Sequence, residues 1–191
     1  MNLPKVDLTL LYDAHLTVPE AAYLARVSAR LVQNEIDEKI VGVRLSGGRR
    51  SISGVDLLYL SAVRRLHGQM APRLRRQVRN AIAHSVAEHA KTAGVEFFVV
   101  TLKALEDDVL NGFEALERVK REFVDIHPDV LAGEPVLRGT RLSVRLIADL
   151  VKQGATAAEL AEEYDLSPEQ IDAASLYDRV TPKRGRPRRA T

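Results

Sequence analysis

The sequence predicts a mainly α-helical protein with short β-hairpins, arranged as two small domains joined by a long helix. Three observations lead to this fold class. Helix start signals of the Ser/Thr-x-x-Glu/Gln type recur along the chain, and apolar residues follow them at helical spacing. The β-type runs between the helices are short and lie next to glycines. A length of 191 residues is enough for two domains, each with its own apolar core.

Composition limits the class of protein. Hydrophobic residues make up 46% and charged residues 28%, which is ordinary for a globular chain. The absence of cysteine excludes disulfides and thiolate metal sites. No apolar run approaches the ~20 residues that span a bilayer, and the N-terminus lacks the layout of a signal peptide. We therefore expect a cytoplasmic protein without membrane contact.

Charge is distributed unevenly, although the net charge is only +2. No acid lies between Asp56 and Glu88, a stretch that holds six arginines, and none follows Asp178, where six basic residues gather. Segregation of this kind predicts contacts with a polyanion from two regions. The plainer alternative is that long helices carry charged, solvated faces.

Two short helices are predicted near the N-terminus. Thr17 and Glu20 form a capping box that opens the first helix. After a tight turn, Ser28 can cap a second helix that ends near Lys39. The inner stripe of this second helix consists of Ala29, Val32, Ile36 and Ile40. Two such helices make a helix-turn-helix, whose second helix enters the major groove of DNA.

A wing is predicted to follow. Residues 41–45 alternate like a strand, residues 46–50 form a flexible basic turn, and residues 51–52 return as a second strand. Ser53 then caps the next helix. The whole of residues 14 to 66 resembles the MerR and excisionase type of winged helix-turn-helix.

Candidate DNA contacts lie on both parts of this segment. Arg, Gln and Asn side chains form hydrogen bonds with the edges of guanine and adenine. The start of the second helix is therefore the candidate base-reading surface, with Ser28, Arg30, Gln33 and Asn34. The wing would hold phosphates through Arg44, Arg49 and Arg50. Phosphates would repel the acids of the same helix, so we expect Glu35, Asp37 and Glu38 to face away. A winged helix used for protein contact is the alternative.

The middle of the chain is predicted to be a basic helix and a strand. Pro72 can open a helix that runs to about Lys91, with its arginines at 73, 75, 76 and 79 largely outside. Residues 95–100 are rich in β-branched and aromatic side chains, which predicts the strand that begins the second domain.

A heptad seam follows this strand. Its apolar residues recur at alternating steps of three and four, with Gly112 inside the pattern. The seam predicts a homodimer interface made by Leu102, Leu105, Val109, Leu116 and Val119. Packing of the same helix on its own domain is an equally good interpretation.

A short arginine-bearing hairpin then precedes three further helices. Gly133 and Gly139 allow the turns, and Thr156 and Ser167 open two of the helices. The run from Asp125 to Val136 and the Gly139-Thr140-Arg141 after it resemble the prokaryotic domain of unknown function 433 over about residues 122 to 180.

This domain occurs in antitoxins of VapB type, and the segment from Val27 through Ile40 resembles the N-terminal half of such antitoxins. The resemblance implies a PIN-domain ribonuclease toxin as partner and operator DNA as ligand. Arginines around the hairpin would then contact the toxin: Arg138, Arg141 and Arg145.

The C-terminal tail is strongly basic. Residues 183 to 189 resemble an AT-hook, whose narrow Arg-Gly-Arg-Pro core fits the minor groove, so Arg184 and Arg186 are candidate DNA contacts. A tail that plugs the acidic site of the toxin, or a merely solvated tail, are the alternatives.

No catalytic constellation appears, and we expect neither an enzyme nor a cofactor nor a metal site. The expected domains are a winged helix at 1–68, a connecting helix at 69–94, a dimerisation and toxin-binding domain at 95–180 and a tail at 181–191. The expected function is an antitoxin of a type II system that represses its own operon. A stand-alone MerR-like regulator is the alternative.

Overall fold

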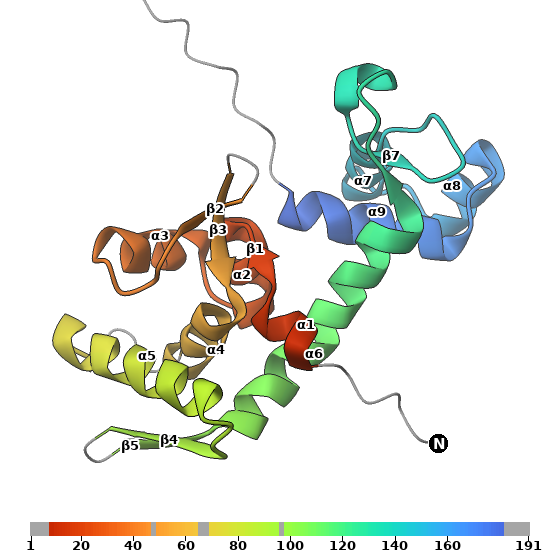
Figure 1. The fold of residues 1–191 in the computed structure, drawn as a ribbon. Coiled ribbons are helices and arrows are strands. Elements are labelled where there is room, and N and C mark those ends of the chain that lie inside the picture. The colour runs from red at the N-terminus through yellow and green to blue at the C-terminus, as the bar shows by residue number, and fades with distance from the viewer. Residues whose placement is uncertain (1–7, 47–48, 65–68, 96–97, 182–191) are drawn as a thin grey trace, which may run out of the picture. The chain divides into compact units, whose positions relative to one another are not determined.

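The computed structural model describes residues 8–46, 49–64, 69–95 and 98–181. The fold is mainly helical with a few short antiparallel strands, as the sequence predicts (Figure 1). The chain divides into two compact units, residues 1–113 and 114–191. None of the helices in the described part of the chain combines the length and apolar character needed to cross a bilayer.

The N-terminal unit contains six helices and five strands within the described residues. In chain order they are α1 (Leu8–Tyr12), β1 (His15–Leu16), α2 (Val18–Ala25), α3 (Ala29–Asp37), β2 (Arg44–Ser46), β3 (Arg49–Ser53), α4 (Gly54–Val63), α5 (Pro72–Ala87), β4 (Thr92–Val95), β5 (Phe98–Thr101) and α6 (Leu102–Arg118). The last of these continues beyond the unit boundary at residue 113.

Helices α2 and α3 begin at the predicted caps. The Thr17 backbone N–H donates to Glu20 Oε2 at 2.7 Å, and the Glu20 N–H donates to Thr17 Oγ1 at 3.4 Å, which completes the capping box. The chain leaves α2 through Arg26, which has a left-handed φ of 56°. Ser28 Oγ then accepts the Leu31 N–H at 3.1 Å and starts α3.

Three strands form a small antiparallel sheet in the order β1-β3-β2. In the β2–β3 hairpin Arg44 lies opposite Ser51, Leu45 opposite Arg50 and Ser46 opposite Arg49. The return strand is therefore longer than expected, and the arginines at 49 and 50 belong to β3 and not to the turn. Helix α2 contacts both α3 and β3, so the sheet and the two helices share one core.

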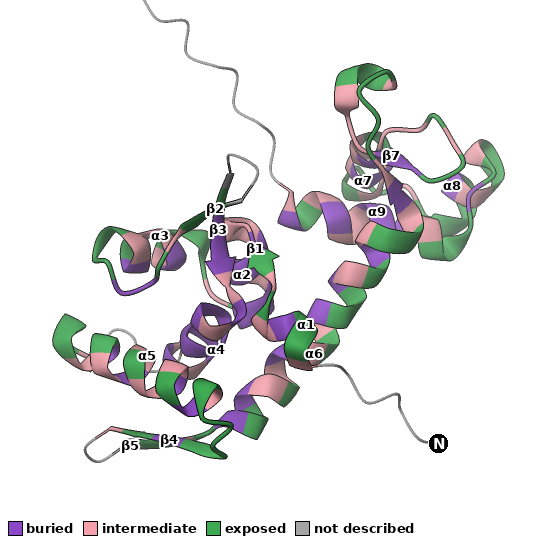
Figure 2. Ribbon diagram, in the orientation of Figure 1, coloured by how far each residue is buried: buried purple, intermediate pink, exposed green. Residues whose placement is uncertain are grey.

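Helix α4 is the centre of the N-terminal unit. Leu57, Leu58 and Leu60 are fully buried in it, and Figure 2 shows most of the helix in the colour of buried residues. Its first residue, Gly54, is approached so closely by α1 that an added Cβ would lie 1.8 Å from the Leu11 carbonyl oxygen. Only glycine fits at this position without a backbone shift.

The boundary between the units falls later in the chain than expected. Strand β4 packs on α5, and β5 pairs with β4, so the hairpin belongs to the N-terminal unit. The first part of α6 is also attached there, because Tyr12 donates to Glu106 and Ser61 donates to Asp108 at 2.7 Å. A hypothetical Cβ on Gly112 would lie 3.2 Å from Leu24 Cδ2, so α6 passes close to α2 at this glycine.

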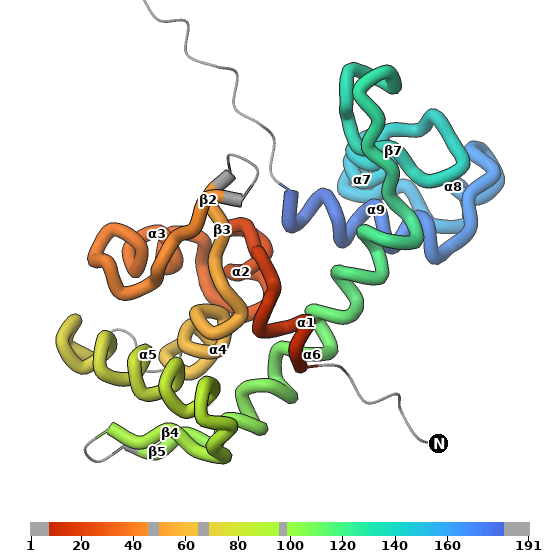
Figure 3. Tube along the Cα trace, in the orientation of Figure 1, coloured from red at the N-terminus to blue at the C-terminus, as the bar shows by residue number. Residues whose placement is uncertain are grey.

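The C-terminal unit consists of a small hairpin and helices. Its elements after α6 are a π-helical turn η2 (Val119–Phe123), β6 (Val124–Asp125), a 3₁₀ turn η3 (Leu131–Gly133), β7 (Val136–Leu137), α7 (Val144–Lys152), α8 (Ala157–Tyr164) and α9 (Pro168–Val180). Strand β6 pairs antiparallel with β7, and the chain then runs through the three predicted helices in succession (Figure 3). Ser143, Thr156 and Ser167 cap these helices.

The core of the C-terminal unit is apolar. Leu137, Ile147 and Leu160 come from β7, α7 and α8 and are at most 1% exposed. Ile171 and Ala174 of α9 join the same cluster. Helix α9 packs mainly on α7 and also on η2 and α8.

The predicted dimer seam is buried within a single chain. The exposed fractions are 3% for Leu102, 9% for Leu105, 1% for Val109, 0% for Leu116 and 7% for Val119. Side chains this deeply buried have almost no surface left to offer a second chain. Packing within the chain, the interpretation that the sequence left open, accounts for the seam.

Candidate nucleic-acid interface

The N-terminal half of α3 presents polar side chains to solvent. Ser28, Arg30 and Asn34 are all exposed, and neither Arg30 nor Asn34 is bonded through its side chain to another described residue. Gln33 is only half-buried, but its Nε2 donates to Asp37 Oδ1 at 2.9 Å. Of the four predicted base readers, Arg30 and Asn34 are therefore the most available.

The acids of α3 are directed mainly inward. Glu35 is fully buried, accepts a hydrogen bond from the Tyr59 hydroxyl at 2.6 Å and forms an ion pair with Arg75. Glu38 forms an ion pair with Arg75 at 2.7 Å. The third acid, Asp37, is exposed. Two of the three carboxylates that phosphates would repel are thus neutralised within the unit.

Helix α5 holds the C-terminal end of α3. Besides its two ion pairs, Arg75 donates from Nε to the Met70 carbonyl at 3.2 Å, and Arg76 donates to the backbone carbonyl of Glu38 at 3.0 Å. A cation at this end also opposes the negative end of the helix dipole. Burial lowers the pKa of Arg75, yet an arginine stays charged in proteins. Burial, together with the charges of Glu38 and Asp56, raises the pKa of Tyr59, which keeps its hydroxyl a donor.

The acid-free stretch that includes α5 is not an open polyanion surface. Arg75, expected outside, is 5% exposed, and Arg79 pairs with Asp56 at 2.8 Å. Arg64 pairs with Asp108 at 2.8 Å. The acids that neutralise these arginines come from other parts of the chain, so the local absence of acids in the sequence was misleading. Arg73 remains exposed.

The β2–β3 hairpin carries two described arginine side chains, Arg44 and Arg50, and both are exposed. Because side chains alternate along a strand, the register places them on opposite faces of the hairpin. The side chain of Arg49 lies outside the described part of the chain, as do the whole of Arg184 and Arg186 in the tail.

The arginines predicted to contact a toxin lie in different surroundings. Arg138 is half-exposed and reaches Asp125 Oδ1 from Nε at 3.0 Å and from Nη2 at 2.8 Å. Arg141 is exposed and forms no ion pair with another described residue. Arg145 pairs with Asp178 at 3.6 Å.

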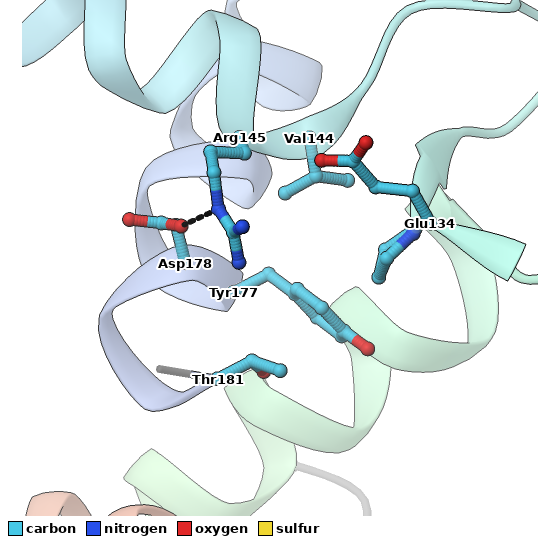
Figure 4. A pocket seen from close by; sticks show the side chains of 7 residues that line it. Glu134, Val144, Arg145, Tyr177, Asp178 and Thr181 are labelled. Carbon is cyan, nitrogen blue, oxygen red and sulfur yellow. Dashed lines mark ion pairs between the residues drawn. The ribbon is translucent and has the colours of Figure 1, made fainter. Parts of the chain in front are cut away.

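A small cleft surrounds Arg145 (Figure 4). Its lining residues are Glu134, Pro135, Val144, Arg145, Tyr177, Asp178 and Thr181. The Arg145 Nε atom is buried and has no hydrogen bond, while Asp178 also pairs with Lys152 at 2.5 Å. The lining holds two carboxylates, those of Glu134 and Asp178, and a single guanidinium, so its charge does not favour an anion.

Comparison with known proteins identifies the relatives of the chain. It is 32% identical over 187 residues to the uncharacterized protein y4eO of Sinorhizobium fredii, a match that covers 91% of this chain and 84% of the relative. The chain belongs to the family of y4eO. Among solved structures it is similar to Rv2018 of Mycobacterium tuberculosis, with 17% identity over 86% of this chain and 98% of that one, and a TM-score of 0.36.

Residues 124–177 of this chain match the family described as protein of unknown function (DUF433). The match confirms the domain predicted at about residues 122 to 180. It begins at β6 and ends in α9, so Arg138, Arg141 and Arg145 all lie inside it.

The cluster made by Glu35, Tyr59 and Arg75 was not predicted from the sequence. A signal was present, because Glu35 follows the buried Val32 by three positions and Arg75 precedes the buried Val78 by three. Each helix therefore carries a charged residue at a position that helical spacing places on its buried face. Opposite charges on two such faces indicate a buried ion pair.

Proposed function

We propose that this protein is a DNA-binding antitoxin of a type II toxin–antitoxin system, and that α2, α3 and the β2–β3 hairpin act as a winged helix-turn-helix. One observation carries the DNA-binding part. Glu35 and Glu38 are turned towards Arg75, while Arg30 and Asn34 are exposed on the first turns of the same helix. This arrangement removes most of the repulsion that the acids of α3 would otherwise exert on phosphates.

The roles of the exposed residues follow from their chemistry. Arg30 and Asn34 suit base edges in the major groove, since guanidinium and amide groups form bidentate hydrogen bonds there. Arg44 and Arg50, on opposite faces of the hairpin, suit phosphates on either side of it. The homodimer remains part of the proposal, formed through a surface other than the seam side chains, and light scattering of the full chain tests it.

Replacement of Arg30 tests the DNA-binding part. A duplex is first selected from a random-sequence library with the wild-type chain, and its affinity is compared with that of a random duplex. Arg30→Ala is expected to weaken binding to the selected duplex by about 1–3 kcal/mol and binding to random DNA by less. Arg73→Ala is the matched control, because Arg73 is equally exposed but lies on α5. Equal losses in both variants would contradict the placement of the interface on α3.

The toxin-binding part rests on the resemblance of the DUF433 region to VapB-type antitoxins. Exposed Arg141 is the best candidate contact for the carboxylate-lined site of a PIN-domain ribonuclease. Copurification with the product of an adjacent gene, and relief of ribonuclease inhibition by Arg141→Ala, are the expected results. Arg138 forms an ion pair with Asp125 within its own unit, so this side chain is less available to a toxin. That observation favours the second candidate function, a stand-alone regulator. Selective DNA binding with no copurifying nuclease would support that candidate.

A further inference from the structure

Helix α3 is attached to its unit unevenly. At its N-terminal end, the cap is the exposed Ser28. At its C-terminal end, the ion pair of Glu35 with Arg75 is buried, with side-chain exposures of 0% and 5%, and Tyr59 donates to the same carboxylate. The exposed end is the one that presents Arg30, and the buried end is the one that determines where the helix axis points.

The contacts of Arg75 are directional. Its guanidinium uses Nη1 for Glu35, Nη2 for Glu38 at 2.7 Å and Nε for the Met70 carbonyl at 3.2 Å. A planar fork with donors in fixed directions restricts both the rotation and the tilt of the helix whose acids it holds. The neighbouring Arg76 adds a contact to the carbonyl of Glu38, the residue that ends α3 as its C-cap, so α5 fixes side chains and backbone together.

Stability is a poor reason for such a cluster. A buried ion pair loses much of its Coulomb energy to desolvation, and apolar side chains of similar volume often replace one without loss of stability. What apolar side chains do not supply is direction. An arrangement of this kind is therefore better suited to orient a helix than to hold the fold together.

We propose that Arg75 is a positioning residue for DNA recognition, which orients α3 through Glu35 and Glu38 so that Arg30 and Asn34 reach base edges. The inference rests on the proposed DNA-binding function. Arg75 does not touch DNA itself, and its effect passes through α3. Helix α5 thereby contributes to base recognition indirectly, through α3. Near its start it also carries two exposed arginines, Arg73 and Arg76, and Arg76 donates to the Glu38 carbonyl.

Two matched double variants separate orientation from stability. Glu35→Gln/Arg75→Gln replaces the ion pair between α3 and α5 by a neutral pair, and the glutamine at 35 retains an acceptor for Tyr59. Asp56→Asn/Arg79→Gln does the same to the pair between α4 and α5, whose exposures are 3% and 27%, and leaves α3 untouched. Each is assayed on the selected duplex, on a random duplex and by thermal unfolding.

The α3 variant is expected to lose about tenfold or more in affinity for the selected duplex, the equivalent of one bidentate base contact, with random-duplex affinity unchanged. The α4 variant is expected to bind both duplexes like wild type. A folded α3 variant with wild-type discrimination would overturn the inference, as would the same loss of discrimination in the α4 variant.

Arg75→Lys tests the positioning role of Arg75 if the α3 double variant does not fold. Lysine keeps the charge near Glu35 but not the planar fork, so the chain should fold and still lose discrimination between the two duplexes. Wild-type discrimination in folded Arg75→Lys would overturn the inference. A wild-type chain that selects no duplex at all would instead refute the proposed function, a result readily distinguished from these.

Discussion

The two units of the chain differ in how deeply their charged side chains are buried. In the described part of the N-terminal unit, four charged side chains are less than a tenth exposed: Glu20, Glu35, Asp56 and Arg75. In the described part of the C-terminal unit no charged side chain is less than a tenth exposed, and the least exposed partner in an ion pair is Asp178 at 12%. The same residue types therefore form buried contacts between helices in one unit and more exposed pairs in the other.

The comparison predicts which substitutions each unit tolerates. A buried charge that loses its partner is strongly destabilising, whereas an exposed pair contributes little. The N-terminal unit should be sensitive to the loss of single charges, and the C-terminal unit to the loss of apolar volume. Hydrogen exchange, read separately for amides before and after residue 113, assigns each effect to its unit.

The largest effect is expected from Arg75→Met, because it leaves the Glu35 carboxylate buried without its cation. The free energy of unfolding of the N-terminal unit should fall by about 3–5 kcal/mol. Urea unfolding monitored by hydrogen exchange in α3 and α4 measures it. A loss similar to that of an exposed pair would contradict the contrast between the units.

Ile147→Ala tests the other side of the comparison. Ile147 is fully buried in the apolar cluster of the C-terminal unit, so its truncation should cost about 2–5 kcal/mol. Backbone amides in α7 and α9 should be the first to lose their protection from hydrogen exchange. Leu146→Ala is the control, because the neighbouring Leu146 is 43% exposed and should have little effect.

Acid should destabilise the N-terminal unit through Asp108. Burial of this carboxyl favours the neutral form, but the Ser61 hydrogen bond and the charges of Arg64 and Arg26 outweigh it and hold the pKa below the ordinary 3.8. A depressed pKa means that the ionised group stabilises the fold above pH 3.8, and that this stability disappears as the pH falls through the folded-state pKa. Asp108→Asn should flatten the acid limb of the stability curve, measured by denaturant unfolding from pH 5 downwards. An unchanged acid limb would show that Asp108 is not responsible.

The smallest effect is expected from Arg138→Gln in the C-terminal unit. Its pair with Asp125 is half-exposed, and such pairs contribute about 0–1 kcal/mol, less at high salt. The free energy of unfolding of the variant should differ from that of the wild type by close to zero, at both low and high salt. A loss comparable to that of Arg75→Met would remove the distinction drawn between the units.

Local signals in the sequence predicted much of the fold. The caps at Thr17, Ser28 and Ser53, and those at Thr156 and Ser167, all start helices in the structure. A cap involves residues only three apart, so its outcome depends little on the rest of the chain. The hairpin with three following helices was likewise predicted, because its turn residues and helix starts are adjacent in sequence.

Long-range pairing was not predictable in the same way. Arg75 was expected on the solvated face because its sequence neighbours are arginines, yet its partners lie on α3, some forty positions earlier. The seam around Val109 showed the apolar spacing of a dimer helix, and that spacing is the same for a helix buried in its own chain. In both cases the pattern of residues along the helix is visible in the sequence. The element that each face packs against is decided by the tertiary fold.

The attachment of α6 to the N-terminal unit has a practical consequence for expressing this unit alone. A fragment ended at residue 94, where a strand seemed to open a new domain, would remove Glu106 and Asp108. Tyr12, Ser61 and Arg64 would then lose the acceptors that they have in the intact chain. A fragment that extends through Phe113 keeps these acceptors, and it also keeps Gly112 against Leu24. The shorter piece should be prone to aggregation and proteolysis, and the longer piece should fold by itself.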